Sequence, residues 1–182
     1  MAKKKIIFIT NSENKVKEAQ EILGDEFSIS LVKFDLDEIQ TVDGKKVIKK
    51  KAEEAYNLLR QPLIVEDTSL YFDAWNGLPG ALVRWFLDTV ECEGICRMMD
   101  KEINRKAWAE SVVAYHNGKD IKIFSAKLEG TVPQKPKGEY KFGWDPIFVP
   151  KGYKKTFGEL GPEEKNKIST RKLALEKLGK YL

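Results

Sequence analysis

The sequence has few of the residues that most often act as catalytic bases, nucleophiles or zinc ligands. It contains one histidine and two cysteines among 182 residues. His116 stands directly before Asn117-Gly118, a dipeptide typical of hairpin turns, so we expect its side chain to be exposed. This placement argues against a catalytic triad built on a histidine base. Cys92 and Cys96 lack the ligand spacings of a zinc site, and we expect two half-buried free thiols.

Long apolar runs are also missing. The chain has no run of 18 apolar residues, so we expect no membrane-spanning helix and no membrane partner. The first ten residues, MAKKKIIFIT, contain too few apolar residues for a signal peptide, and we expect a cytoplasmic protein. No internal repeat, low-complexity tract or flexible linker interrupts the sequence. The length therefore predicts one domain over residues 1–182.

Charged residues are plentiful and nearly balanced in sign. Lysine and arginine number 32 against 28 aspartates and glutamates, which gives a formal net charge of +4. Several lysines, among them Lys49, Lys50 and Lys51, fall in predicted helices. They form either a solvated helix face or a surface for an anionic ligand, a nucleotide or a nucleic acid.

Apolar periodicity predicts helices that alternate with strands, followed by a hairpin. The predicted strands cover residues 5–10, 27–34, 62–67, 107–116 and 120–130. The predicted helices cover residues 14–24, 43–60, 91–100 and 162–168, with one more after Pro79-Gly80 and another capped by Ser169. This order predicts an α/β protein with a mixed sheet.

The first candidate site is the segment from Thr10 to Lys15, between a predicted strand and a predicted helix. Thr10 and Glu13 have the spacing of a capping box, which would make the segment purely structural. A helix N-terminus with a lysine in its first turn also suits a phosphate group. Both interpretations are open at this stage, because the glycine pattern of a phosphate-binding loop is absent.

The second candidate site is the pair Glu66 and Asp67, which follows the apolar run Leu63–Val65. Open α/β sheets bind ligands at the carboxyl ends of their strands, where we expect this pair. Alternatively, Asp67 caps the next turn. Glu38 is a further candidate carboxylate, and scattered carboxylates without histidine or cysteine suit Mg²⁺.

Two further candidates lie near the C-terminal end of the chain. Phe142, Trp144 and Asp145 close a long loop rich in proline and glycine, where aromatic rings either join the core or stack on a base. Lys165 and Arg171 flank a predicted helix start. They form either a surface charge cluster or a reader of a base edge or phosphate, for which a guanidinium is well shaped.

Taken together, these motifs resemble the inosine triphosphate pyrophosphatase family, the Ham1-like enzymes. The resemblance rests on VEDTSLYFDAWNGLPGALVRWFL (65–87), FGWDPIF (142–148), KTFGEL (155–160) and EEKNKIS (163–169). It implies Mg²⁺-dependent, or Mn²⁺-dependent, hydrolysis of ITP, dITP and XTP to the monophosphate and pyrophosphate. It also implies an elongated fold with a long central mixed sheet, two lobes with the active-site cleft between them, and a homodimer.

The resemblance also implies roles for individual residues. Asp67, Glu66 and Lys15 are expected to be catalytic, and the expected metal ligands are Glu38, Glu66 and Asp67. The expected substrate-binding residues are Thr10, Asn11, Ser12, Lys15, Lys51, Phe142, Trp144, Asp145, Lys165, Ser169, Thr170 and Arg171.

Two positions depart from the pattern of the family. Ser12 stands where asparagine is usual, so its hydroxyl or the neighbouring Asn11 must replace an amide. Thr170 stands where histidine is usual, which suggests the same chemistry with altered or relaxed base specificity as an alternative. A nucleic-acid-binding module fits less well, because Glu38, Glu66 and Asp67 would repel phosphates without a metal. We therefore expect a nucleotide substrate and no nucleic-acid partner.

Overall fold

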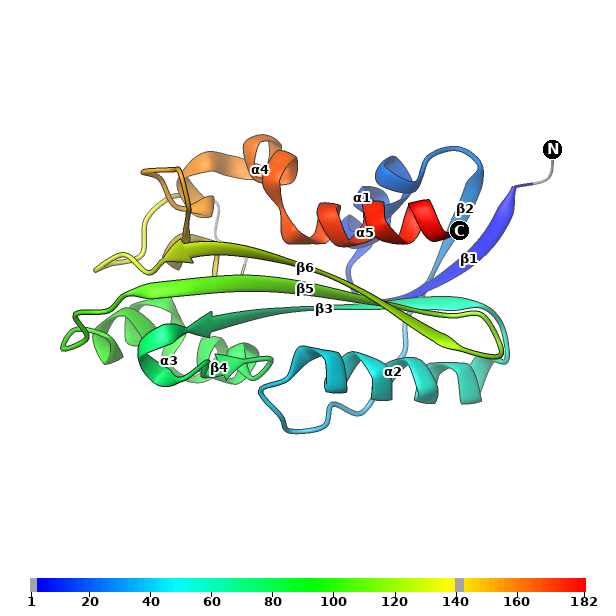
Figure 1. The fold of residues 1–182 in the computed structure, drawn as a ribbon, viewed down its shortest axis with the longest axis horizontal. Coiled ribbons are helices and arrows are strands. Elements are labelled where there is room, and N and C mark those ends of the chain that lie inside the picture. Colours follow the sequence, from blue (N-terminus) through cyan, green and yellow to red (C-terminus); the bar gives the residue numbers. More distant parts are fainter. Residues whose placement is uncertain (1–2, 140–142) are drawn as a thin grey trace. The chain divides into compact units, whose positions relative to one another are not determined.

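The protein is described here by a computed structural model, which covers residues 3–139 and 143–182 (Figure 1). Its helices are α1 (Glu13–Leu23), α2 (Gly44–Leu59), α3 (Val83–Met98), α4 (Phe157–Ile168) and α5 (Thr170–Tyr181), with short 3₁₀ helices η1 (Asp73–Trp75) and η2 (Asp145–Ile147). Its strands are β1 (Lys4–Ile9), β2 (Phe27–Val32), β3 (Leu63–Phe72), β4 (Pro79–Gly80), β5 (Lys106–His116), β6 (Ile121–Thr131) and β7 (Val149–Pro150).

The strands of the described residues form one mixed sheet in the order β2-β1-β3-β5-β6-β7, with β4 beside β3. Strand β1 runs parallel to both β2 and β3, whereas the β3–β4 and β6–β7 pairs are antiparallel. The predicted α/β class with a mixed sheet is therefore confirmed. Within this fold the chain divides into two compact units. The first unit comprises the chain up to Asp67, residues 111–126 and residues 171–182, and the second unit comprises residues 68–110 and 127–170.

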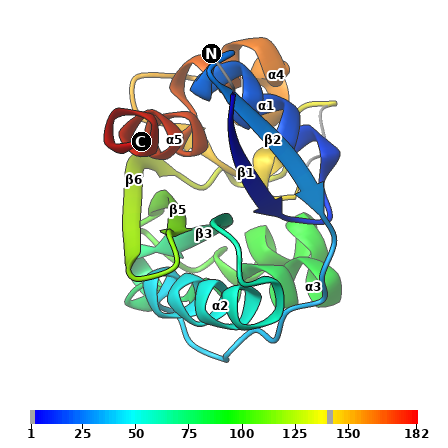
Figure 2. The same ribbon diagram turned by 90° about the vertical axis from the view of Figure 1, so that its right-hand side faces the viewer.

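In the first unit, helices cover both faces of the sheet. Ile64 packs in a cluster with residues of α1 and α5, whereas its neighbours Leu63 and Val65 pack with residues of α2. Successive strand residues point to opposite faces, which explains this division. Figures 1 and 2 show the same arrangement, with α1 and α5 on one side of the strands and α2 on the other.

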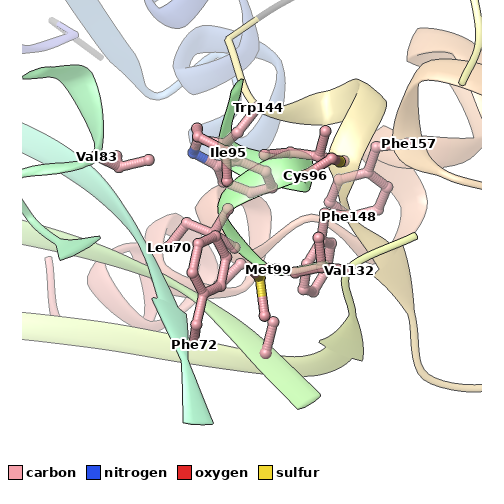
Figure 3. Close-up of a cluster of buried hydrophobic side chains, with 13 residues drawn as sticks. Leu70, Phe72, Val83, Ile95, Cys96, Met99, Val132, Trp144, Phe148 and Phe157 are labelled. Carbon is pink, nitrogen blue, oxygen red and sulfur yellow. The ribbon is translucent and has the colours of Figure 1, made fainter. Parts of the chain in front are cut away.

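In the second unit, several aromatic residues pack together in the core. Phe72, Phe148 and Phe157 are almost completely buried, and Trp144 is 9% exposed in the same cluster (Figure 3). Helix α3 contributes Val83, Ile95 and Cys96 to it. The segment after Trp144 is therefore held in place by packing as well as by hydrogen bonds.

Strand β3 is longer than the sequence suggested. The predicted strand ends at Asp67, but β3 continues to Phe72. The strand stays buried beyond the carboxylates, and Leu70 and Phe72 are both fully buried. The prediction that Glu66 and Asp67 end a strand is therefore wrong: they lie in the middle of one.

The helix starts also differ from prediction. Ser12, rather than Thr10, caps α1, because its side chain accepts the Lys15 N–H. The predicted helix 162–168 is the second part of α4, which starts at Phe157 behind a capping box of Thr156 and Glu159. Gly161, with φ of 74°, separates the two parts. The helix predicted before residue 91 and the one predicted after it are joined in α3, with Glu91 in a non-helical conformation between them.

His116 is buried rather than exposed, so the sequence prediction was wrong. It is 8% exposed, and its ring stacks on Tyr56 of α2 with centroids 3.9 Å apart. Burial lowers the pKa of His116 below its ordinary value. Both cysteines are free thiols, as predicted; Cys92 is half-buried as expected, whereas Cys96 is buried. No helix in the described part of the chain has the length and hydropathy to cross a membrane.

Candidate functional site

The start of α1 presents a polar turn in the first unit. The Thr10 hydroxyl accepts the Ser12 N–H at 3.1 Å, and the Ser12 hydroxyl accepts the Lys15 N–H at 3.4 Å. Asn11 is exposed between them. This turn places the positive end of the α1 dipole and Lys15 at one location, an arrangement that suits a phosphate group.

Glu66 is a buried carboxylate that two cations approach. Its Oε2 lies 2.6 Å from Lys15 Nζ, and its Oε1 accepts the Arg171 Nε–H at 3.3 Å. Arg171 was predicted to read a base or a phosphate, yet its Nη1 donates to Glu18 Oε2 at 2.8 Å. Burial lowers the pKa of Arg171, but the two carboxylates outweigh burial and raise it, so the guanidinium stays charged.

Glu18 was not among the predicted site residues. It lies three residues after Lys15 in α1, so both side chains point to the same side of that helix. The signal was present in the sequence as two opposite charges three residues apart, with Lys15 four residues before the buried Ala19. Its partner Arg171 is 153 residues away, a pairing that no local pattern reveals.

Asp67 faces a different cation. Its Oδ1 lies 3.7 Å from Lys51 Nζ, and Lys51 also donates to Glu38 Oε1. Burial raises the pKa of Asp67, which Lys51 and Lys15 partly offset, and Glu66 and Glu38 raise it further. A carboxyl group with a raised pKa accepts a proton more readily near neutral pH.

The two adjacent carboxylates therefore have separate partners. The Glu66 side chain is 0% exposed and lies on the α1 and α5 side, whereas the Asp67 side chain is 21% exposed and lies beside α2. Because the two residues are consecutive in a strand, they point to opposite faces. Glu66 is the more tightly held of the two, and Asp67 is the more accessible.

Whether a divalent cation can bind here depends on the group formed by Glu38, Lys51 and Asp67. Within the described residues, no three histidine, cysteine or acidic side chains form a ready metal cage. However, the carboxylates of Glu38 and Asp67 converge on a single point, the Lys51 ammonium. Mg²⁺ usually takes only one or two carboxylates together with water and substrate phosphates. The residues present fit a Mg²⁺ ion of that kind.

In the second unit, Asp145 and Lys165 form a buried ion pair. Asp145 Oδ2 lies 2.6 Å from Lys165 Nζ, and the side chains are 2% and 12% exposed. Trp144 belongs to the aromatic core, with its ring 5.5 Å from that of Phe148 and 6.1 Å from that of Phe157. The structure thus supports the core interpretation for Trp144, and Phe142 lies outside the described residues.

The remaining predicted residues lie at the junction of α4 and α5. Ser169 ends α4 in an extended conformation, with φ of −66° and ψ of 141°, and Thr170 begins α5. Their exposed fractions are 7% and 4%. The structure thus collects the predicted phosphate and acidic residues in the first unit and Asp145 with Lys165 in the second. The predicted cleft stays a prediction.

Comparison with known proteins places the whole chain in one group. Residues 6–181 match the Ham1 family. An inosine triphosphate pyrophosphatase of Yarrowia lipolytica is 40% identical over 181 residues, 97% of this chain and 95% of that protein. One from Schizosaccharomyces pombe is 40% identical over 179 residues, 97% of this chain and 94% of that protein. A dITP/XTP pyrophosphatase of Methanopyrus kandleri is 39% identical over 181 residues, 97% and 95% of the two chains.

Solved structures agree with the sequence comparison. The Staphylococcus aureus Ham1 protein superimposes with a TM-score of 0.86 at 25% identity, covering 98% of this chain and 97% of that one. A HAM1 protein from Coxiella burnetii also gives a TM-score of 0.86, at 26% identity and 98% coverage of both chains. With the sequence match over nearly its full length, the chain belongs to the Ham1 family.

Proposed function

We propose that this protein hydrolyses noncanonical purine nucleoside triphosphates, namely ITP, dITP and XTP, to the monophosphate and pyrophosphate. The observation that carries the proposal is the first-unit group, in which the buried Glu66 pairs with Lys15 at the start of α1 and the more accessible Asp67 lies beside Lys51. Relatives about 40% identical over 97% of the chain bear the names inosine triphosphate pyrophosphatase and dITP/XTP pyrophosphatase.

Lys15 and Lys51 are proposed to bind the triphosphate. Both ammonium groups now lie against carboxylates, Lys15 on Glu66 and Lys51 on Glu38 and Asp67. Their side chains are 20% and 13% exposed, so both are shielded from bulk solvent. Shielded cations attract phosphate oxygens more strongly than solvated ones do. The backbone N–H groups at the start of α1 would add neutral donors.

Asp67 is proposed to accept the proton of the attacking water. Its carboxyl group is the more accessible of the adjacent pair, and burial raises its pKa. Glu66, held by Lys15 and Arg171, would instead fix the position of Lys15. Glu38 and Asp67 would hold Mg²⁺ or Mn²⁺, whereas Glu66, the third predicted ligand, points to the other face of β3, where Lys15 and Arg171 hold it. When bound, such an ion neutralises phosphate charge and lowers the pKa of coordinated water.

The second-unit pair is proposed to bind the base. The carboxylate of Asp145 can accept a base N–H, and Lys165 fixes its position through the ion pair. Buried polar groups discriminate between bases because a wrong base leaves them without a partner. A homodimer and a cytoplasmic location remain further proposals, made from the family resemblance and the sequence.

Pyrophosphate release with Mg²⁺ tests the proposal directly. The substrates to compare are ITP, dITP, XTP, ATP, GTP and the pyrimidine triphosphates. Strong preference for ITP, dITP and XTP is expected, and a flat profile would contradict the proposed substrate class.

A matched pair of lysine variants tests the site. Lys51→Met should lower kcat/KM for ITP by about tenfold or more, because it removes a shielded phosphate contact. Lys50→Met changes an exposed lysine of the same helix and should leave kcat/KM unchanged. Equal effects of the two substitutions would show that overall charge, and not the site, is responsible.

A further inference from the structure

We propose that Thr156 and Gly138 are positioning residues that fasten Lys137, and through it the turn that contains Asp145, to the helix that carries Lys165. This inference rests on the proposed base-binding role of Asp145 and Lys165. Neither Thr156 nor Gly138 touches the ion pair in the contacts described above. Their effect would be on where the pair is held.

The Thr156 hydroxyl makes two different hydrogen bonds. Its Oγ1 accepts the Glu159 N–H at 3.1 Å, which caps α4, and donates to the Lys137 carbonyl oxygen at 2.8 Å. The Thr156 side chain is completely buried. Capping uses only a lone pair of the hydroxyl oxygen, so the hydroxyl proton can donate a second hydrogen bond. That second hydrogen bond holds the loop at Lys137.

The Lys137 backbone continues the connection toward Asp145. Its N–H donates to the Pro146 carbonyl oxygen at 2.9 Å, one residue after Asp145. The two polar groups of the Lys137 backbone therefore link the η2 turn to the start of α4. The second part of α4, beyond Gly161, bears Lys165, whose ammonium lies 2.6 Å from the Asp145 carboxylate. A shift at Lys137 would be transmitted to the relative placement of the pair.

Gly138 allows the loop to lie directly on the helix start. Its φ is +99°, and an added Cβ would lie 2.0 Å from the Gly158 carbonyl carbon and 2.3 Å from Glu159 N. A side chain at this position would push two backbone segments apart. Gly152 offers a matched comparison, because its φ is +87° and no heavy atom lies within 4 Å of an added Cβ.

The two products of the proposed reaction separate base binding from phosphate binding. IMP carries the base, whereas pyrophosphate carries none. Both products should inhibit ITP hydrolysis, which is measured with Mg²⁺ well below the melting temperature. The inhibition constant of IMP therefore includes base binding, whereas that of pyrophosphate reports on phosphate binding alone. A loop displaced by about 1 Å should weaken IMP binding by about tenfold and leave the inhibition constant of pyrophosphate unchanged.

Gly138→Ala and Gly152→Ala form the first comparison. Both impose alanine on a positive φ, so their backbone strain is similar, but only Gly138→Ala forces the loop away from Gly158. The inhibition constant of IMP should rise about tenfold in Gly138→Ala and stay within about twofold in Gly152→Ala. Equal values in the two variants, or an equal loss of IMP and pyrophosphate binding, would overturn the proposal.

Thr156→Ala and Thr156→Ser form the second comparison, which also serves if Gly138→Ala does not fold. Serine keeps the hydroxyl that both hydrogen bonds use, whereas alanine removes it. The alanine variant should weaken IMP binding and the serine variant should restore it. If Thr156→Ala lowers only the melting temperature and leaves the IMP constant unchanged, Thr156 is merely a helix cap and the proposal fails.

Failure of the proposed function would be recognised separately. A wild-type protein that releases no pyrophosphate from any purine triphosphate would refute that function, and amide hydrogen exchange would then test the positioning alone. Faster exchange at residues 143–148 in Gly138→Ala than in Gly152→Ala would support the fastening role. The same exchange in both variants would overturn it.

Discussion

Replacing Asp145 by asparagine should destabilise the protein strongly, because it removes a carboxylate that neutralises the buried Lys165 ammonium. The two groups are 2.6 Å apart, and their side chains are 2% and 12% exposed. At that distance, and with an effective dielectric constant of about 20, the Coulomb attraction is about 6 kcal/mol, most of which offsets desolvation. Removing one partner of such a pair typically costs about 3–5 kcal/mol.

Urea denaturation and thermal melting measure this effect. For a chain of this length, a loss of that size should lower the melting temperature by about 10 °C. Glu129→Gln is the control, because Glu129 and Lys151 are 2.7 Å apart but 62% and 74% exposed. Exposed pairs contribute little to stability, so no measurable change is expected there. Equal losses in the two variants would refute the claim that burial gives the Asp145 pair its importance.

A double variant separates the structural role of the pair from its proposed binding role. Asp145→Asn combined with Lys165→Met removes both charges, and most of the lost stability should return because the buried positive charge is removed together with the negative one. If the pair also binds the base, the folded double variant should still have a raised KM for ITP. A double variant with wild-type KM would contradict the base-binding role and leave the stability argument intact.

Three further predictions concern other groups. Asp67→Asn should lower kcat by about a hundredfold or more without unfolding the protein; retention of more than about a tenth of kcat in a steady-state assay would exclude Asp67 as the proton acceptor. Burial lowers the pKa of His116, so the unfolded chain binds more protons just below the ordinary value of about 6.5. The free energy of unfolding should therefore fall as the pH drops through that range, and His116→Gln should flatten this dependence. Burial raises the pKa of Cys92 to about 12 and of Cys96 to about 11. Iodoacetamide should therefore alkylate both thiols about a hundredfold more slowly in the folded than in the urea-unfolded protein, and equal rates would contradict burial.

Local patterns predicted much of the fold. The Asn117-Gly118 turn located the β5–β6 hairpin, and the apolar spacing of residues 47–55 located α2. The errors arose where a local signal had two interpretations. Glu66 and Asp67 resembled a strand end, because charged residues are rarely placed inside a buried strand. The structure accommodates them because cations from α1, α2 and α5 meet them there.

Contacts between distant parts of the chain could not be predicted. The Asn117-Gly118 turn correctly predicted that the backbone at His116 ends a hairpin strand. The burial of the His116 side chain, however, depends on Tyr56, which lies 60 residues earlier in a helix. The contact of Arg171 with a base or a phosphate stays a prediction, and its hydrogen bond to Glu66, 105 residues away, could not be predicted from local patterns. The sequence indicates that a guanidinium needs an anionic partner, but only the folded structure shows which residue that partner is.

One sequence signal would have distinguished the site cations from the many solvated lysines. Lys51 is in phase with the buried residues Ile48 and Ala55 of α2, whereas its neighbours Lys49 and Lys50 are exposed. Arg171 is likewise in phase with the buried apolar residues of α5. A charged residue on the apolar face of a helix costs free energy unless a partner or ligand compensates it.

The strand between these helices determines which cation each carboxylate meets. Because Glu66 and Asp67 are consecutive in β3, one side chain points toward α1 and α5 and the other toward α2. A shift of β3 by one residue would exchange their faces and would also move Ile64 and Val65 out of the clusters in which they pack. The packing of Ile64 and Val65 into separate clusters therefore fixes which carboxylate is neutralised by Lys15 and Arg171 and which stays accessible beside Lys51. The different roles proposed for Glu66 and Asp67 therefore follow from the burial of Ile64 and Val65 on opposite faces of β3.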